Sequence, residues 1–329
     1  MRKWVPTVRA MACVVLALLA AGPLSPAAHA QANYPSRPVR AILPYSPGTT
    51  ADLIARNLGP QLSEAWKVPF IVDNRAGASG IIGVQAAIAA APDGHTLVFV
   101  ADNFASAASV HNKPYDPVAD LDPVILLARG DYALITPASF PAKTVADLIA
   151  MARANPGTIN YASPGNGLPA HLMMELFKST LGVSLVHVPY KSNAAAVTDI
   201  IGGQVSAMFT SMGVALPLST GGRVRILAAG AAKRTPRTPE IPSLIEAGIR
   251  EFNVGTWFAM LVPKNTPQEI KAKLNADVGA LLRLPAVAEL MGKQGIAVAG
   301  GAPEELHELI RSDFERWNKV VREAKITAD

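Results

Sequence analysis

The chain alternates between short apolar runs and longer segments in which apolar residues recur at helical spacing. The first apolar run, 39–43, favours a buried strand, and the loop at 44–48, rich in proline and glycine, ends it. Apolar residues from Leu53 to Leu62 then follow a helical period, and Thr49 or Thr50 is placed to cap that helix. The N–H groups exposed at such a helix start favour an anion.

This order of strand, loop and helix repeats along the chain. Further strands are expected at 69–74, 96–100, 159–163, 183–190, 205–209 and 224–229, and helices between them, including one at 144–155. Strands that alternate with helices predict an α/β fold with doubly wound parallel sheets. Ligands of such sheets lie beyond the carboxyl ends of the strands, so we expect the loops at 44–52, 76–80 and 101–106 to share one crevice.

The length and two extended segments predict two lobes. A mature chain of about 300 residues normally divides into two domains. We interpret the apolar segment 124–137 as the first crossing into the second lobe and 254–263 as the return. The expected first lobe is therefore 31–129 together with 252–329, whose C-terminal helices pack on it, and the second lobe is 130–251.

The first thirty residues have the layout of a cleavable secretory signal. Positively charged residues begin the segment, an apolar run follows at 11–22, and the small residues 28–30 precede Gln31. The apolar run is too short to span a bilayer. We therefore expect cleavage after Ala30 and export to the periplasm.

Removal of this segment changes how the composition is interpreted. Arg2, Lys3 and Arg9 leave with it, which lowers the formal charge from +5 to +2. The basic isoelectric point therefore argues little for nucleic acid or membrane binding. Cys13 is the only cysteine, so the mature chain is expected to have neither a disulfide nor thiolate chemistry.

The loop at 44–52 resembles the first loop of the Bug-type periplasmic receptors of tripartite tricarboxylate transporters, which has the pattern P-[FY]-x-P-G-G-x-x-D. The matching residues are Pro44, Tyr45, Pro47, Gly48 and Asp52. Thr49 stands where the family has its second glycine, so a side chain occupies a place where the family offers bare backbone. This difference bears on which ligand is accepted.

Four later segments carry the same resemblance. They are 74–83, close to N-R-P-G-A-G-G-N-I-G but with Ala76, Ser79 and Ile81; 163–172, where Ser163, Gly165, Gly167, His171 and Leu172 match; 187–192, close to H-V-P-Y-K-G; and 239–248. The segment 163–172 is the most specific of them. The resemblance covers nearly all of the mature chain and implies a two-lobed periplasmic-binding-protein fold of type II (Venus flytrap), with two doubly wound sheets joined by two crossover strands.

The resemblance further implies a receptor, not an enzyme, that holds a small organic carboxylate between its lobes and delivers it to permease subunits. The implied ligand-binding residues are Tyr45, Ser46, Thr49, Thr50, Asp52, Ala78, Ser79, Gly80 and Asn103 from the first lobe, Ser163, Gly165, Asn166, His171, Thr210 and Ser211 from the second, and Trp257 from the return crossing. No cofactor, metal or nucleic acid is expected, and the protein is expected to be monomeric. A receptor without a cognate permease, used for sensing, is the alternative within the family.

Several of these residues have a second interpretation. Asp52 repels a carboxylate, so it either fixes the helix start or accepts a hydrogen bond from a ligand hydroxyl or amine. Trp257 is either a packing residue at the hinge or an aromatic wall of the site. Gly77 and Gly80 are either plain turn residues or part of the ligand loop.

The leading alternative from another class is a secreted hydrolase or lyase on the same architecture. The segment 77–81 approaches the nucleophile motif G-x-S-x-G but ends in Ile81. The segment 165–170 fits a dinucleotide loop, yet His187 and Val188 stand where its acidic residue belongs. His171 and His187 lack the spacing of a zinc pair, which favours a packing role for both.

Overall fold

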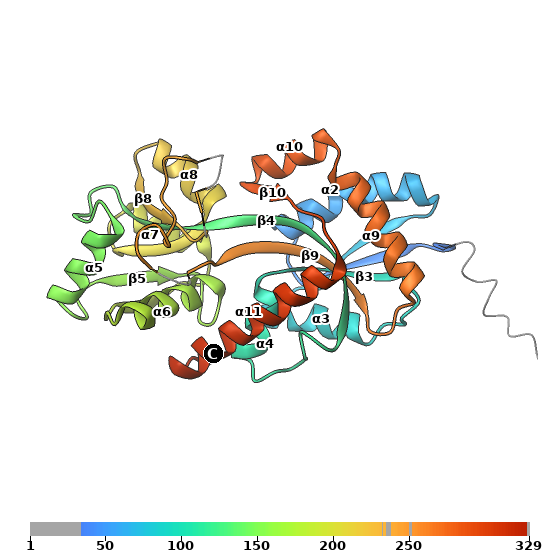
Figure 1. Ribbon diagram of the computed structural model, residues 1–329, viewed down its shortest axis with the longest axis horizontal. Coiled ribbons are helices and arrows are strands. Elements are labelled where there is room, and N and C mark those ends of the chain that lie inside the picture. Colours follow the sequence, from blue (N-terminus) through green and yellow to red (C-terminus); the bar gives the residue numbers. More distant parts are fainter. Residues whose placement is uncertain (1–33, 232, 235–237, 250–251, 328–329) are drawn as a thin grey trace, which may run out of the picture. The chain divides into compact units, whose positions relative to one another are not determined.

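A computed structural model describes residues 34–231, 233–234, 238–249 and 252–327, and the predicted signal segment lies outside them (Figure 1). Its strands are β1 (Val39–Leu43), β2 (Phe70–Asn74), β3 (Thr96–Ala101), β4 (Leu121–Pro137), β5 (Asn160–Ser163), β6 (Val186–Pro189), β7 (Ala207–Ser211), β8 (Val224–Ala229), β9 (Gly255–Pro263) and β10 (Ile296–Val298). Its helices are α2 (Thr50–Trp66), η2 (Ala78–Gly80, a 3₁₀ turn), α3 (Ile81–Ile88), α4 (Asn103–Val110), α5 (Val145–Ala154), α6 (Pro169–Leu181), α7 (Asn193–Ile201), α8 (Met212–Thr220), α9 (Gln268–Leu282), α10 (Pro285–Lys293) and α11 (Pro303–Glu323).

The strands form one sheet in the order β2-β1-β3-β9-β4-β7-β5-β6, and β8 and β10 also pair with β4. β1 is parallel to β2 and β3, and β5 is parallel to β6 and β7, so one three-stranded arrangement occurs twice. Parallel neighbours require crossover connections, which α2, α3, α6 and α7 supply. The helical and strand periods of the sequence therefore give the doubly wound pattern that they predict.

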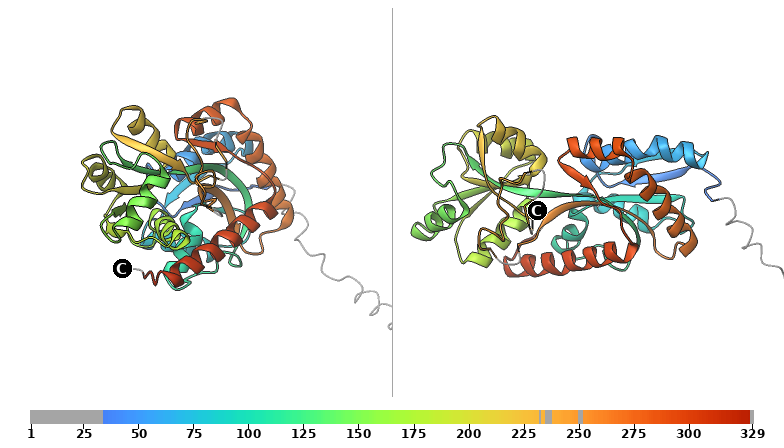
Figure 2. Two further views of the ribbon diagram at one scale, coloured as in Figure 1. Left: turned by 60° about the vertical axis from the view of Figure 1, so that its left-hand side comes forward. Right: turned by 45° about the horizontal axis from the view of Figure 1, so that its top comes forward.

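The long strand β4 joins the two halves of the sheet. Its residues 121–131 pair antiparallel with β9, whereas 132–137 pair with β7 and β8. Figures 1 and 2 show β4 and β9 side by side, with α2, α3, α9 and α10 around one end of β4 and α5 to α8 around the other. The two expected sheets are thus continuous with each other, because β4 hydrogen-bonds in both.

Each half has its own apolar core. In the first, Ile42 and Val98 of the sheet pack with Phe104 of α4. In the second, Phe177 of α6 and Phe209 of β7 pack within the same buried cluster. Burial of each such side chain contributes about 1.5–3 kcal/mol of hydrophobic free energy, so each half has apolar packing of its own.

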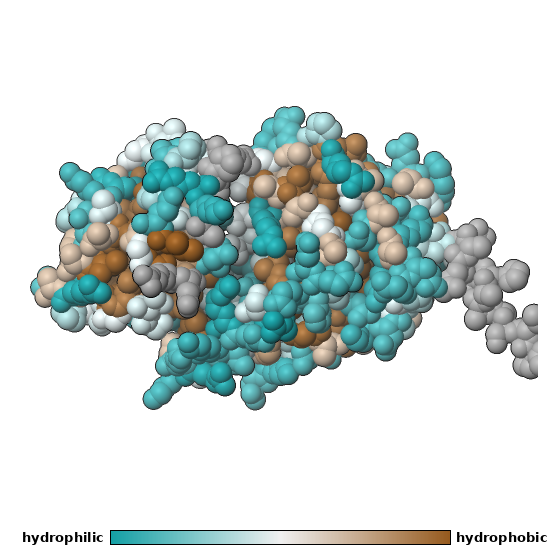
Figure 3. Space-filling model, viewed as in Figure 1, coloured by the Kyte–Doolittle hydropathy of each residue, from teal (hydrophilic) through white to brown (hydrophobic). Residues whose placement is uncertain are grey.

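The C-terminal helix α11 contacts both halves. Leu306 and Ile310 belong to the core of the first half, while Trp317 and Val320 belong to the core of the second. These apolar positions follow a helical period, and the opposite face is hydrophilic, as Figure 3 shows along α11. The expected packing of this helix on the first lobe is therefore joined by packing on α6 of the second.

The loop expected at 101–106 is shorter than predicted. Helix α4 begins at Asn103, and its small residues allow close packing against α11. Only Asp102 therefore separates β3 from α4. In the described parts of the chain, no helix combines the length and apolar character needed to cross a membrane.

Candidate functional site

A cleft of about 250 Å³ lies where the β1–α2 loop faces β4 at Tyr132 and the first residues of β9. Its lining residues are Tyr45, Thr49, Thr50, Ala51, Ala101, Asp102, Tyr132, Ser211, Thr256, Phe258, Gln294 and Ile296. Tyr45, Thr49, Thr50 and Ser211 were predicted from the sequence. Half of the lining residues carry a hydroxyl group, and no lysine, arginine or histidine occurs among the described residues that line it.

The N-terminus of α2 opens onto this cleft through Thr50 and Ala51. The first N–H groups of a helix have no acceptor within the helix. Thr49 occupies the cap position, but its hydroxyl donates to the Ser46 carbonyl at 3.0 Å and makes no capping bond. The start of α2 is therefore a polar surface with partial positive charge, which suits an anionic group.

Asp52 holds the loop before α2 in shape. Its carboxylate accepts hydrogen bonds from the Gly48 N–H at 2.9 Å, from Arg56 Nε at 2.9 Å and from Asn74 Nδ2 at 2.9 Å. Burial opposes ionisation, but these three hydrogen bonds outweigh it and keep the pKa of Asp52 below its ordinary value. Of the two roles considered from the sequence, the structure shows the fixing of the helix start. The side chain does not line the cleft.

Tyr45 and Asn103 connect the cleft to the neighbouring loop. The Tyr45 hydroxyl donates to Asn103 Oδ1 at 2.7 Å and accepts from the Ala101 N–H at 2.7 Å. The Asn103 amide in turn donates to the Ser79 carbonyl at 3.0 Å. Burial raises the pKa of Tyr45, so its hydroxyl remains protonated as a donor. Asn103 thus supports the site without lining the cleft.

The loop at 77–80 has an unusual backbone. All four residues have positive φ, including the non-glycine residues Ala78 at 47° and Ser79 at 56°. The Gly80 N–H donates to the Gly77 carbonyl at 3.0 Å, which closes this turn. Backbone strain in non-glycine residues is typical of functional loops. His111 Nε2 lies 3.3 Å from Ser79 Oγ, and His111 has no carboxylate contact in the described part of the chain.

In the second half, the loop after β5 is turned inward. The Ser163 side chain is fully buried, its hydroxyl donates to the Gly165 carbonyl at 3.0 Å, and it lies 2.7 Å from His187 Nε2. His171 Nδ1 accepts the Gly167 N–H at 2.9 Å. The two imidazole rings stack with centroids 3.9 Å apart. The sequence favoured packing for both histidines, and these contacts are of that kind.

Most of the second-lobe residues predicted for the site do not line the cleft. Thr210 is 2% exposed, and its hydroxyl lies 3.4 Å from Asn193. Ser163, Gly165, Asn166 and His171 likewise lie outside the lining, and only Ser211 belongs to it. In the first lobe, Ser46 and the loop at 78–80 are also not part of the cleft wall.

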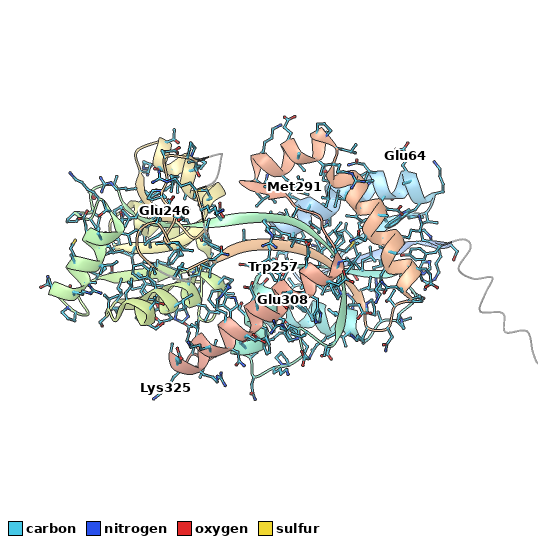
Figure 4. All side chains as sticks on the ribbon, in the orientation of Figure 1. Glu64, Glu246, Trp257, Met291, Glu308 and Lys325 are labelled. Atoms are coloured by element: carbon cyan, nitrogen blue, oxygen red, sulfur yellow. The ribbon has the colours of Figure 1, made fainter. Side chains whose placement is uncertain are left out.

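Trp257 is a packing residue. It is 2% exposed, and its indole Nε1 donates to Asp313 of α11 at 2.7 Å. Figure 4 places it between β9 and α11. Side chains alternate along a strand, so its neighbour Phe258 faces the cleft instead. Of the two interpretations of Trp257, the structure therefore shows packing beside the crossing strands.

Asp102, Tyr132 and Thr256 are polar lining residues that were not named among the predicted site residues, although Asp102 belongs to the loop 101–106 that was expected at the crevice. Tyr132 donates to Asp102 Oδ2 at 3.0 Å, and Thr256 donates to Asp102 Oδ1 at 3.2 Å. Burial raises the pKa of the Asp102 carboxyl to about 7; the nearby Asp313 carboxylate adds to this rise, and the hydrogen bonds from Tyr132 and Thr256 oppose it. The position of Asp102 at the carboxyl end of β3 is a sequence signal that could have identified it.

Metal binding was also considered at the cleft and elsewhere. Across residues 34–231, 233–234, 238–249 and 252–327, no group of three or more histidine, cysteine, aspartate or glutamate side chains is arranged to hold a metal ion.

Comparison with known sequences gives matches over almost the whole chain. The family model described as "Tripartite tricarboxylate transporter family receptor" matches residues 54–326. A protein encoded in the tcbD–tcbE intergenic region of Pseudomonas sp. strain P51 is 36% identical over 298 residues, which is 90% of this chain and 89% of that protein. BugT of Bordetella pertussis is 34% identical over 294 residues, 88% of this chain and 90% of that protein.

Solved structures agree with these matches. A Rhodopseudomonas palustris protein with adipate is 33% identical, with a TM-score of 0.77 over 89% of this chain and 99% of that one. MatC of Rhodopseudomonas palustris with bound malate is 29% identical, with a TM-score of 0.74 over 88% of this chain and 100% of that one. The periplasmic binding protein BugD is 30% identical, with a TM-score of 0.74 over 90% of this chain and 100% of that one.

Proposed function

This chain belongs to the tripartite tricarboxylate transporter receptor family, and on that basis we propose that it captures a small organic carboxylate in the periplasm for delivery to a membrane transporter. The family match and the solved relatives confirm the predicted two-lobed receptor fold and the receptor role. They give no support to a hydrolase or lyase.

The observation that best supports a carboxylate ligand is the open N-terminus of α2 in the cleft. Thr50 and Ala51 bring the first turn of this helix to the wall. An anion at a helix start gains about 0.3–1 kcal/mol from the helix dipole alone, more when it is partly buried. Ser211 belongs to the same wall, and its hydroxyl can donate to another ligand oxygen.

The remaining predicted site residues have two proposed roles. Asp52, Asn103 and the loop at 78–80 hold the binding surface in shape, with Ser46 accepting from Thr49. Gly165, Asn166 and Thr210 would meet the ligand only after the lobes move, as the family resemblance implies, whereas Ser163 and His171 would hold the β5–α6 loop in shape through their contacts within the second half. Such a movement would bend β4 and β9 near residues 130 and 255, where β4 changes partners.

We propose the lobe boundaries as 31–129 with 252–329, and 130–251. The change of partners along β4 after Asp131 supports the first boundary. We also propose cleavage after Ala30, a monomeric mature protein, and permease subunits as the partner. A sensing role without a permease would use the same cleft.

Incubation of the purified protein with a library of organic carboxylates, followed by native mass spectrometry and analysis of the released small molecules, tests the proposal. A receptor retains one acid unchanged, and its thermal stability rises as the concentration of that acid rises. Conversion of an acid to a new product would support the hydrolase or lyase, and the absence of any retained carboxylate would contradict the proposed function.

A further inference from the structure

Four carboxylates are buried in the described part of the chain, and three of them have a cation beside them. Asp52 pairs with Arg56 at 2.9 Å, and Asp313 pairs with Arg316 at 2.8 Å. Asp122 pairs with Lys264 and with Lys271, both at 3.0 Å. Asp102 is the fourth, 8% exposed, and its side-chain partners are two neutral hydroxyls.

A buried carboxylate without a cation is costly, because neutral hydrogen bonds replace only part of its hydration. Asp102 is also the one of the four that lines the cleft. The cleft wall supplies no cationic side chain among its described residues. An opposite charge for Asp102 can therefore come from a molecule in the cleft.

We infer that the ligand is an amino carboxylate, whose protonated amine binds Asp102 while a carboxylate group binds at the start of α2. This inference rests on the proposed function and narrows its ligand class. Tyr132 and Thr256 each occupy one oxygen of Asp102, which fixes the plane of the carboxylate and leaves its remaining acceptor positions for the ammonium. The cleft thus has an anion-binding start of α2 and one wall that accepts a cation.

The surroundings of Asp102 determine how binding should depend on pH. Three titratable groups interact electrostatically with Asp102: Tyr132 from β4, Tyr45 from the β1–α2 loop and Asp313 from α11. Thr256 from β9, which donates to Asp102, is neutral. None is a cation. Since the pKa of Asp102 is raised to about 7, the free protein carries a mixture of neutral and ionised Asp102 at neutral pH. An ammonium ligand selects the ionised form and releases a proton.

The test uses matched acids that differ in one substituent. Aspartate, malate and succinate share four carbons, and glutamate and 2-aminoadipate have the corresponding hydroxy and unsubstituted partners with five and six carbons. Calorimetric titration of the wild type at pH 8 should show, for at least one chain length, an amino acid that binds about tenfold or more tightly than both partners. Its affinity should fall about tenfold from pH 8 to pH 6, and titrations in buffers of different ionisation enthalpy should report proton release.

Asp102→Asn should remove both the preference for the amine and its pH dependence, whereas Asp122→Asn, at a buried carboxylate outside the cleft, should keep both. Circular dichroism shows whether each variant is folded. If the hydroxy or unsubstituted acid binds the wild type as well as the amino acid at every length, or if the library yields only a retained carboxylate without an amine, the inference is overturned and the proposed function stands. If no carboxylate binds at all, both fail.

Discussion

The β1–α2 loop and the β5–α6 loop occupy equivalent places in the two halves, yet their surroundings are opposite. Both join the carboxyl end of a parallel strand to a helix whose cap residue makes no side-chain capping bond. The first loop opens onto the cleft through Thr49 and Thr50. The second is closed by its own contacts among Ser163, His171 and His187.

The contrast between the two loops distinguishes a motif whose residues make packing contacts from one whose residues line the cleft. The β5–α6 loop matches the family pattern without a departure, and the side chains of Ser163 and His171 in this motif have structural contacts. The β1–α2 loop departs from the pattern at Thr49, and that residue lines the cleft. The closely matched motif here coincides with packing contacts, and the departure lies in the cleft that we propose for the ligand. Substitutions in the β1–α2 loop should therefore change binding, and substitutions in the β5–α6 loop should change stability.

The largest expected effect is that of Asp102→Asn on the pH dependence of folding. The pKa of Asp102 is raised in the folded protein, so its contribution to stability is present at low pH and is lost as pH rises from about 4 through about 7. One pKa unit corresponds to about 1.4 kcal/mol, so the rise from 3.8 to about 7 sets an upper bound of about 4.5 kcal/mol. We expect the difference in the free energy of unfolding between Asp102→Asn and the wild type to shift by about 2–4 kcal/mol in favour of the variant between pH 4 and pH 8. Urea unfolding without ligand measures this difference.

Asp52→Asn is the matched control, because the pKa of Asp52 is lowered. Its contribution to stability is present above the ordinary aspartate pKa and is lost as pH falls, so this variant should be less stable than the wild type at pH 7 and approach it in acid. Parallel pH profiles for the wild type and Asp102→Asn would contradict the assignment of Asp102 as an unpaired buried acid.

The next largest effect is expected for Gly167→Ala in the β5–α6 loop. Gly167 has φ +69°, and a Cβ there would lie 2.5 Å from a methyl of Val110 in α4. Left-handed strain costs about 1–2 kcal/mol and overpacking about 1–3 kcal/mol. We expect a loss of about 2–4 kcal/mol in the free energy of unfolding, measured by urea denaturation.

Gly182→Ala separates the two causes. Gly182 ends α6 with φ +62° and has open space where its Cβ would lie, so it should lose only the strain energy. Adding Val110→Ala to Gly167→Ala should recover the packing part of the loss. Equal losses for the two glycine variants would show that the β5–α6 loop does not press on α4 in solution.

Sequence reasoning performed well where a local pattern decides the structure. Strand 39–43 and strand 224–229 have the predicted bounds, because runs that are apolar apart from one arginine each end at a proline or a glycine. The helix at Asn103–Val110 was missed because its short run of small residues has little helical periodicity. Its stability comes from packing against α11, which only the folded chain provides.

The candidate site was predicted in part for the same reason. Tyr45, Thr49 and Thr50 lie between the end of β1 and the first residue of α2. Ligands of parallel sheets lie beyond the carboxyl ends of the strands, so this position could be predicted. Tyr132 and Thr256 lie within long crossing strands, and their side chains reach the cleft only because β4 and β9 pass through the junction of the halves. No local pattern in the sequence marks such positions.

A smaller effect is expected for Ser163→Ala. The motif alone predicts that Ser163 contacts the ligand, but its buried hydroxyl already bonds to Gly165 and lies next to His187. Loss of a buried hydroxyl that leaves a partner unsatisfied costs about 1–3 kcal/mol. We expect a stability loss of that size and less than about threefold change in affinity, which is under 1 kcal/mol. A ten- to hundredfold loss of affinity at unchanged stability would instead assign Ser163 to the ligand.

The smallest expected effect is that of Thr49→Gly, which restores the residue found in the family pattern. The Thr49 side chain lines the cleft and holds its hydroxyl on Ser46, so its removal should widen the cleft beside the start of α2. A change of one or two carbons in an apolar contact alters selectivity by about tenfold, and the added glycine lowers stability by about 0.5–1 kcal/mol through the unfolded chain. Titration of four-, five- and six-carbon acids should show that Thr49→Gly accepts longer acids about tenfold better relative to the shortest.

Thr49→Ala is the control. It keeps Cβ and an ordinary backbone, so its preference for longer acids should lie between those of the wild type and Thr49→Gly. If all three proteins rank the acids alike, the side chain of Thr49 does not set the size of the ligand, and the difference between the two loops lies in the backbone of the first loop and not in its departure from the family pattern.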